Sequence, residues 1–318
     1  MKKILRVGTR ESQLAVWQAE QVKTLLHRGG YEAELVFIKS EGDIDLKTPL
    51  YEMGVQGIFT RSLDIALLNN RIDLAVHSMK DVPTQLPEGI KQAAVLKRGS
   101  YKDILVMNGK RSMFNRQTIQ EGSPFTIHQP PFTIATSSIR RKAQWLNRYP
   151  DDTIENLRGN VNTRLKKLND STWDGAIFAA AGLERIGLRP EHSVELDWML
   201  PAPAQGAIIV VCSKTDADSF QACSTFNDEH TALCTKIERD FLRTLLGGCS
   251  TPISALAEIK NDIIIFKGNI LSIDGKQKAE VEKKIAMDEA GHLGKDAADE
   301  LLNKGGRKIA REIQDAAK

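Results

Sequence analysis

The stretch ILRVGTRES, residues 4–12, decides the fold expected for this chain. Its first five residues are typical of a short buried strand, and Ser12 can cap the helix that the apolar spacing from Leu14 to Leu26 predicts. A glycine pair ends that helix, and Ala33–Lys39 is typical of a second strand. These elements make a β-α-β unit, which predicts a parallel sheet.

The junction between this strand and its helix carries an arginine. Its sequence is TRES, residues 9–12, and the G-x-G-x-x-G pattern of a dinucleotide-binding turn is missing. Arg10 therefore places a guanidinium beside a helix N-terminus, which is a favourable place for an anion.

The charge balance argues against nucleic acid or a membrane as a partner. Lys plus Arg (44) nearly equals Asp plus Glu (41), and no apolar run resembles a signal peptide or a membrane span. The four cysteines, Cys212, Cys223, Cys234 and Cys249, form no C-x-x-C pair, so we expect no metal ion and no disulfide scaffold. We expect a cytoplasmic protein, and a monomer, because no apolar repeat suggests an obligate interface.

Arginine recurs where later predicted strands end. The strand at 132–135 is followed by the cap sequence TSS, residues 136–138, and a helix over 139–149. The strands predicted at 153–157 and 174–179 are followed by helices in the same way. A single surface arginine is common and indicates nothing by itself. The recurrence of arginine just after successive strands is what indicates a binding site. These arginines are Arg140, Arg141, Arg158, Arg164 and Arg185.

A polar sequence follows the buried strand predicted over 72–77. Ligands of open α/β sheets bind beyond the carboxyl ends of the strands, where Ser78, Lys80 and Asp81 would lie. A carboxylate among guanidiniums can receive an N–H donor or stabilise a developing cation, or it can simply neutralise Lys80 or Arg10. His77 ends the strand and is predicted to be a packed core histidine, not a base.

The order of the predicted elements indicates an α/β fold with three domains. The apolar strand at 207–212 follows a complete second α/β unit and can return to the first sheet, as in two-lobed proteins with a cleft. Beyond it come three strand-like runs with a hairpin turn at Asp274–Gly275, then a helix over 293–317 interrupted at Gly305–Gly306. We predict two periplasmic-binding-protein-like α/β lobes around a cleft, residues 1–104 with 206–224 and residues 105–205, plus a small C-terminal α+β domain, residues 225–318.

Cys249 lies on a predicted loop of the third domain. The helix-favouring run over 241–246 stops at two glycines, and Pro252 prevents a return to helix. A loop cysteine is usually inert. The alternative of an acyl-transfer nucleophile needs a partner base, and no histidine stands in a supporting motif nearby.

A cleft with several guanidiniums suits a ligand with several carboxylates or phosphates, because arginine pairs with both in a bidentate way. One interpretation is a two-lobed anion-binding module without catalysis, akin to solute-binding or regulator effector domains. It explains the arginines and the hinge, but neither Asp81 nor the cysteine loop.

Five motifs in order resemble the porphobilinogen deaminase (hydroxymethylbilane synthase) family. They are AVHSMKDVP (75–83), TSSIRR (136–141), LRGNV (157–161), AGLER (181–185) and GGCSTPI (247–253), and the resemblance runs from Arg6 to the final helix. It implies an enzyme that joins four porphobilinogen molecules head to tail with loss of ammonia. The chain would grow on a dipyrromethane cofactor, held by a thioether to Cys249, and give linear hydroxymethylbilane for tetrapyrrole (haem) biosynthesis.

The resemblance also implies roles for individual residues. Asp81 would be catalytic, contacting pyrrole N–H groups and assisting the loss of ammonia. Each pyrrole carries an acetate and a propionate, which the arginines would bind. The implied cofactor-binding residues are Cys249, Ser78, Lys80, Asp81, Thr136, Ser137, Ser138, Arg140, Arg141, Arg158 and Gly159. The implied substrate-binding residues are Arg10, Gln18, Arg158, Arg164, Arg185 and Gln205.

Three places depart from the family pattern. Bacterial relatives often show TPL-x-K-x-G-x-K-G in the loop predicted over 41–57, whereas this chain has TPLYEMGVQG, residues 48–57. An acid and an amide replace two cations, which favours a loop that closes the cleft by packing through Tyr51, Met53 and Phe59. Ala204 stands where glycine is expected, and the insertion between about 110 and 132 is longer than expected.

Overall fold

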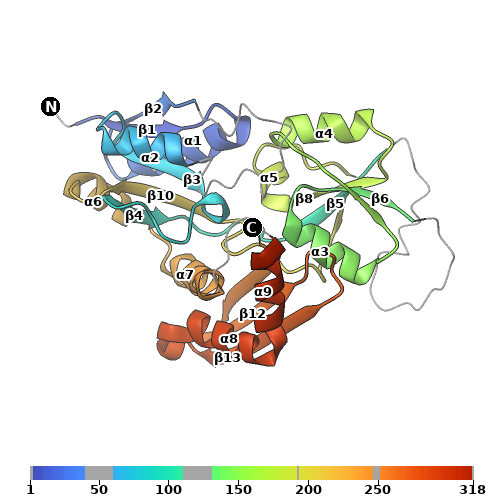
Figure 1. Cartoon of the computed structure of the whole chain (residues 1–318). Coiled ribbons are helices and arrows are strands. Elements are labelled where there is room, and N and C mark those ends of the chain that lie inside the picture. Colours follow the sequence, from blue (N-terminus) through green and yellow to red (C-terminus); the bar gives the residue numbers. More distant parts are fainter. Residues whose placement is uncertain (1–2, 40–59, 110–130, 192, 246–250, 317–318) are drawn as a thin grey trace.

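The computed structural model describes residues 3–39, 60–109, 131–191, 193–245 and 251–316. The strands among these residues form three sheets (Figure 1). The loop predicted over 41–57, nearly all of the insertion at 110–132, and Cys249 lie outside the described residues.

The first sheet has the strand order β2-β1-β3-β10-β4. β1 pairs in parallel with β2 and β3, as the opening stretch predicts, but β10 pairs antiparallel with β3 and β4, so the sheet is mixed. Its elements are β1 (Leu5–Thr9), β2 (Ala33–Phe37), β3 (Leu74–Ser78), β4 (Ile90–Val95) and β10 (Ile208–Ser213), with α1 (Gln13–Arg28), α2 (Arg61–Leu68), the short 3-10 turn η2 (Met79–Asp81) and α6 (Ala217–Ser224). Apolar side chains of α1 and α6 pack on one face and those of α2 on the other.

The second sheet repeats this arrangement with the order β7-β6-β8-β5-β9. β6 pairs in parallel with β7 and β8, and β5 is antiparallel to β8 and β9. Its elements are β5 (Asp103–Met107), β6 (Thr133–Ala135), β7 (Thr153–Glu155), β8 (Gly175–Ala179) and β9 (Ser193–Glu195), with α3 (Ile139–Arg148), α4 (Val161–Asp170) and α5 (Ala180–Glu184). The fourth strand of each sheet, β10 in the first and β5 in the second, follows a segment of the other lobe in the chain. This exchange of strands confirms the predicted two-lobed α/β fold.

The two chain segments that cross between the lobes lie side by side. The amide of Gly99 donates to the carbonyl of Gly206 at 3.0 Å. Gly206 has a φ of 86°, and a Cβ there would lie 2.6 Å from the carbonyl oxygen of Ser100. Only glycine fits this close approach, because any side chain would collide with backbone.

The third sheet is an antiparallel meander in the order β11-β12-β13. The predicted interruption of the last helix is confirmed, since Gly305 has a φ of 101°. The strands are β11 (Ile253–Lys260), β12 (Ile263–Leu271) and β13 (Lys278–Ala286), and the helical segments are α7 (Glu229–Thr244), η4 (Met287–His292), α8 (Leu293–Leu301), the π turn η5 (Leu302–Gly306) and α9 (Arg307–Ala316). Apolar residues of α7, α8 and α9 share one core with this sheet, which confirms a separate small C-terminal α+β unit.

A buried carboxylate on α7 joins the third unit to the first lobe and to a crossing segment. Glu238 is 0% exposed and accepts hydrogen bonds from Arg98 Nη1 at 2.6 Å and Arg98 Nη2 at 3.1 Å. It also accepts from the backbone amides of Ala204, at 2.6 Å, and Ala257, at 2.8 Å. Ala204 is fully buried with a φ of 61°, a conformation uncommon for a residue with a side chain. The bond to Glu238 helps to hold it there.

We predict that Glu238→Gln strongly destabilises the protein. The substitution keeps the size of the side chain but leaves the largely buried charge of Arg98 without its counter-charge, and breaking such a pair costs about 3–5 kcal/mol. Chemical denaturation measures the loss. Lys236→Gln, which breaks an exposed pair with Asp240 on the same helix, is the control and should cost less than about 1 kcal/mol. Equal stabilities of the two variants would contradict the role of Glu238.

Candidate active site

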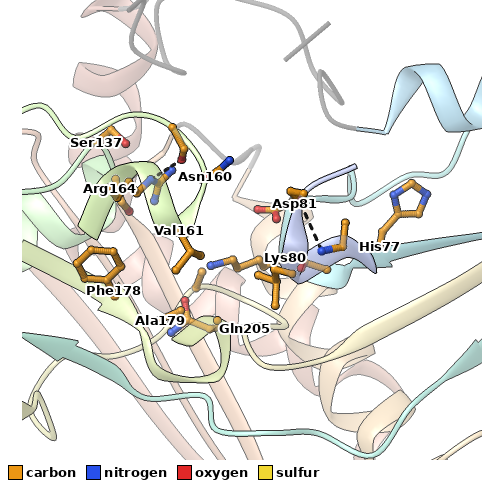
Figure 2. A pocket seen from close by; sticks show the side chains of 18 of the residues that line it. His77, Lys80, Asp81, Ser137, Asn160, Val161, Arg164, Phe178, Ala179 and Gln205 are labelled. Atoms are coloured by element: carbon orange, nitrogen blue, oxygen red, sulfur yellow. Dashed lines mark hydrogen bonds between the residues drawn. The ribbon is translucent and has the colours of Figure 1, made fainter. Parts of the chain in front are cut away.

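A pocket of about 310 Å³ lies between the two lobes. The first lobe contributes the start of α1, the end of β3 and the turn η2, and the second lobe contributes the starts of α3 and α4. Figure 2 shows Lys80 and Asp81 on one side and Ser137, Asn160 and Arg164 on the other. The carboxyl ends of strands from both lobes therefore face one space, as the sequence predicts.

The turn η2 presents the polar residues of the first lobe. Met79 donates its amide to Ala207 of the returning strand segment at 3.0 Å. Gln18 on α1 is buried, and its Nε2 donates to the Ser78 hydroxyl at 2.9 Å. Burial lowers the pKa of Lys80 to about 8, although the charge of Asp81 opposes that shift.

Two arginines in the first turn of α3 share a carboxylate that the sequence interpretation missed. Arg140 Nη2 lies 2.7 Å from Asp103 Oδ2, and Arg141 Nη2 lies 2.8 Å from Asp103 Oδ1. Burial alone would raise the pKa of Asp103, but the charges of Arg140 and Arg141 outweigh it and lower the pKa to about 2. Their guanidiniums also donate to the backbone, Arg140 to Leu200 and Arg141 to Ile177. The sequence does hold a sign of this partner: Asp103 is an acidic residue at the start of the apolar strand β5.

Gln205 completes this buried network from the crossing segment. Its Nε2 donates to Asp103 Oδ1 at 2.8 Å and to the carbonyl of Tyr101 at 2.8 Å. Gln205 is 1% exposed, yet it lines the pocket. The network therefore connects the pocket lining to the segments that cross between the lobes.

A second cationic group surrounds the start of α4. Asn160 caps this helix by accepting from the amide of Thr163 at 2.9 Å. Arg164 Nε donates to the carbonyl of Gly159 at 2.7 Å. Burial and the neighbouring charges of Arg141 and Arg158 lower the pKa of Arg164 to about 10, against the opposing effect of Asp81. An anion in the pocket would relieve this repulsion between cations.

Most residues that the resemblance implies for the site come together, and two of them do not. Thr136 is buried, and its hydroxyl accepts from the amide of Ser138 at 3.2 Å outside the pocket lining. Arg185 also lies outside the lining: its Nη2 donates to Gly206 at 2.6 Å, and its guanidinium lies over the Trp17 ring. The residues in the lining are Arg10, Gln18, Ser78, Lys80, Asp81, Ser137, Ser138, Arg140, Arg141, Arg158, Gly159, Arg164 and Gln205.

His77 is buried, as predicted, although it also borders the pocket. Burial, and then the charge of Arg10, lower the pKa of His77 to about 3. The imidazole is therefore neutral at physiological pH.

The three cysteines that the structure describes are buried thiols with raised pKa values. Cys212, Cys223 and Cys234 are buried, and burial raises the pKa of Cys212 to about 11 and that of Cys234 to about 12. Burial also raises the pKa of Cys223. Within the described ranges, no His, Cys, Asp and Glu side chains gather in a group that could hold a metal ion. None of the helices described there combines the length and the apolar content needed to cross a bilayer.

Together, the fold and the pocket define a class: a two-lobed α/β protein with a cationic pocket between its lobes and a third, C-terminal unit. Six cationic side chains and one carboxylate, Asp81, are among the described residues of the lining. The family model "Porphobilinogen deaminase, dipyromethane cofactor binding domain" matches residues 5–221, and "Porphobilinogen deaminase, C-terminal domain" matches residues 232–303. The chain belongs to the porphobilinogen deaminase family, which is a family of enzymes with a dipyrromethane cofactor.

Relatives in two bacteria support this assignment. Porphobilinogen deaminase of Pelobacter propionicus is 38% identical over 313 residues, covering 97% of each chain. That of Chloroherpeton thalassium is 38% identical over 323 residues, covering 99% of each chain. Among solved structures, the BvgS periplasmic VFT2 domain of Bordetella pertussis has 12% identity and a TM-score of 0.40, over 72% of this chain and 90% of that one. The family assignment rests on the sequence matches alone.

We predict that Lys80 gives the protein a pH-dependent stability. Its pKa of about 8 lies below the ordinary value of 10.5, so the folded state disfavours the charged amine. That destabilisation is complete below pH 8 and disappears as the pH rises towards 10.5. In cofactor-free protein that carries Cys249→Ser, the Tm should therefore rise by a few degrees relative to that of the same protein with Lys80→Met between pH 7 and pH 10. A constant difference in Tm would show that Lys80 does not titrate in this range.

Proposed function

We propose that this chain is a hydroxymethylbilane synthase that joins four porphobilinogen molecules head to tail on a dipyrromethane cofactor linked to Cys249. Each addition forms one carbon–carbon bond between pyrroles, breaks one carbon–nitrogen bond and releases ammonia. The observation that carries the proposal is the pocket between the lobes, in which Asp81 faces a group of guanidiniums. The family assignment names the reaction class, and the pocket supplies side chains that suit it.

The charge of the pocket fits a ligand with many carboxylates. Each pyrrole unit brings two carboxylates, so a chain of several units is a polyanion. Lys80 and Arg164 both have lowered pKa values because burial disfavours their charges, and an anion beside them would restore those charges. Arg140 and Arg141 already share Asp103, which favours a role in shaping the pocket as well as in binding. We propose that Arg10, Arg158 and Arg164 bind carboxylates of the substrate or the growing chain.

Asp81 is positioned for the chemical step. A carboxylate accepts hydrogen bonds and donates none, so it can receive pyrrole N–H groups. The loss of ammonia leaves positive charge on the substrate, and a fixed carboxylate beside that charge stabilises the transition state. Lys80 and Arg164 lie close enough to interact electrostatically with Asp81, and they can hold the substrate's own carboxylates.

Two observations support Cys249 as the attachment site. The other three cysteines are buried with raised pKa values, so they do not offer thiolates. Leu242 and Thr251, on either side of the cysteine in the sequence, both line the pocket. Two residues of chain span at most about 7 Å, which keeps position 249 within reach of the pocket. When bound, dipyrromethane would supply the pyrrole carbon on which the chain starts.

Some expectations about the whole protein also remain proposals. We propose a cytoplasmic monomer that acts on the small molecule porphobilinogen. We propose three domains with the limits predicted from the sequence, except that the second lobe begins at Asp103. The antiparallel ladder between β5 and β8 already includes Asp103, which pairs with Ala179.

We predict that the purified protein is heavier than its sequence mass and that the addition lies on the Cys249 peptide. Intact mass spectrometry with peptide mapping measures both. Cys249→Ser should show the bare sequence mass, whereas the control Cys212→Ser should keep the addition, because Cys212 is buried away from the pocket lining. An unmodified Cys249 peptide in active protein would contradict the attachment site.

We predict that Asp81→Asn folds normally but loses at least about a hundredfold in kcat, because it removes a charge aimed at the reacting group. The release of ammonia from porphobilinogen measures kcat, and thermal unfolding tests the fold. Asp197→Asn, which breaks an exposed pair with Lys102, is the control and should keep the wild-type rate. If Asp81→Asn also kept that rate, the carboxylate would have a structural role only.

A further inference from the structure

The turn that carries Asp81 is held from outside its own lobe. The guanidinium of Arg239 on α7 donates hydrogen bonds to backbone carbonyls on both sides of Lys80 and Asp81. Nη1 donates to Val82 at 2.9 Å and to Met79 at 3.3 Å, and Nη2 donates to Pro83 at 2.6 Å. One side chain therefore contacts the backbone before and after the proposed catalytic carboxylate.

The turn needs such a partner because it is short. η2 contains three residues, and its own closing bond, from the amide of Val82 to the carbonyl of Met79, is 3.2 Å long. The amide of Met79 is fixed by Ala207 on the entering side. On the leaving side, carbonyls at the end of a helical turn carry partial negative charge and favour a cation. The planar fork of arginine can meet two carbonyls at once, which a lysine amine cannot do with the same geometry.

The position of Arg239 is itself fixed. The preceding residue, Glu238, is fully buried and bound to Arg98, Ala204 and Ala257. Phe241 and Leu242, on the next turn, pack into the core of the third unit. The helix that carries Arg239 therefore cannot slide without breaking a buried ion pair. Farther along the chain, Thr251 lines the same pocket.

We propose, on the basis of the proposed function, that Arg239 is a positioning residue that sets the Asp81 carboxylate relative to the third unit. Its guanidinium donates to three backbone carbonyls of the turn, and we infer that it acts through the turn. The unit that carries Cys249 and the lobe that carries Asp81 are thereby joined by a three-bond contact. Without this contact, the turn would keep its sequence and its charge, but its position relative to the third unit would no longer be fixed.

Steady-state kinetics test this role. Arg239→Met should lower kcat by about 100-fold, because displacement of a catalytic group by about 1 Å has that effect, while KM changes by less than about threefold. Arg239→Lys should recover part of the loss, because it returns one cation to the carbonyls. Arg243→Met is the matched control: it lies on the same helix and pairs only at the surface with Asp240, so it should keep the wild-type kcat.

A double-mutant cycle shows whether Arg239 acts through Asp81. Adding Arg239→Met to Asp81→Asn should lower the residual rate by no more than about twofold, since the group being positioned is already gone. A full additional loss of 100-fold would mean that Arg239 acts independently of Asp81 and would overturn the proposal.

Amide hydrogen exchange gives a readout that does not depend on activity. In Arg239→Met, the peptide that contains Met79 to Val82 should exchange faster, while peptides of β11 keep wild-type protection. If wild type proves inactive on porphobilinogen, the proposed function fails and the exchange result still decides the positioning role. If wild type is active and Arg239→Met matches it in both kcat and exchange, the positioning role is overturned. Should Arg239→Met not fold, Arg239→Lys decides by the same two measurements, and wild-type values would again overturn it.

Discussion

The buried ion pair between Arg98 and Glu238 is the interaction on which the arrangement of the molecule depends. It places a charge pair where the two crossing segments, the first lobe and the third unit meet. A buried pair is not a large source of stability by itself, because both ions lose their hydration. It does give a unique geometry, since any shift of α7 would leave a charge or an amide without its partner. The residue next to it, Arg239, is thereby directed at the turn that presents Asp81.

The cations of the cleft divide into two groups with different tasks. Arg140 and Arg141 have an internal counter-charge in Asp103 and donate to backbone carbonyls, so they are satisfied by the fold. Burial lowers the pKa values of Lys80 and Arg164, as it does that of Arg140, but the main opposing charge at Lys80 and Arg164 is Asp81 in the pocket. Folding therefore keeps these cations in an unfavourable environment, and an anionic ligand makes that environment favourable. Under the proposed function, this difference lets one site be rigid at its base and still accept an anionic ligand.

Local sequence patterns predicted the secondary structure well. The strand predicted over residues 174–179 matches β8 to within one residue, and the return of the strand at 207–212 to the first sheet was predicted from its order in the chain. The patterns missed Asp103 as a partner of two arginines, and they missed Glu238 and Arg239 entirely. Arg98 and Glu238 are 140 positions apart, and Arg239 is 160 positions from Met79. Hydrophobic periodicity extends over one helix or strand and carries no information about such distant pairs.

The sequence by itself determined the elements, the two-lobed order, the recurrence of arginine at strand ends and the family motifs, because each of these is written in neighbouring residues. Tertiary structure decided which of those arginines line the pocket. Arg185 follows a strand end like the others, yet it contacts Gly206 and Trp17 outside the pocket lining. Whether an arginine lines the pocket or donates to another segment depends on how distant parts of the chain pack, and neighbouring residues do not record that.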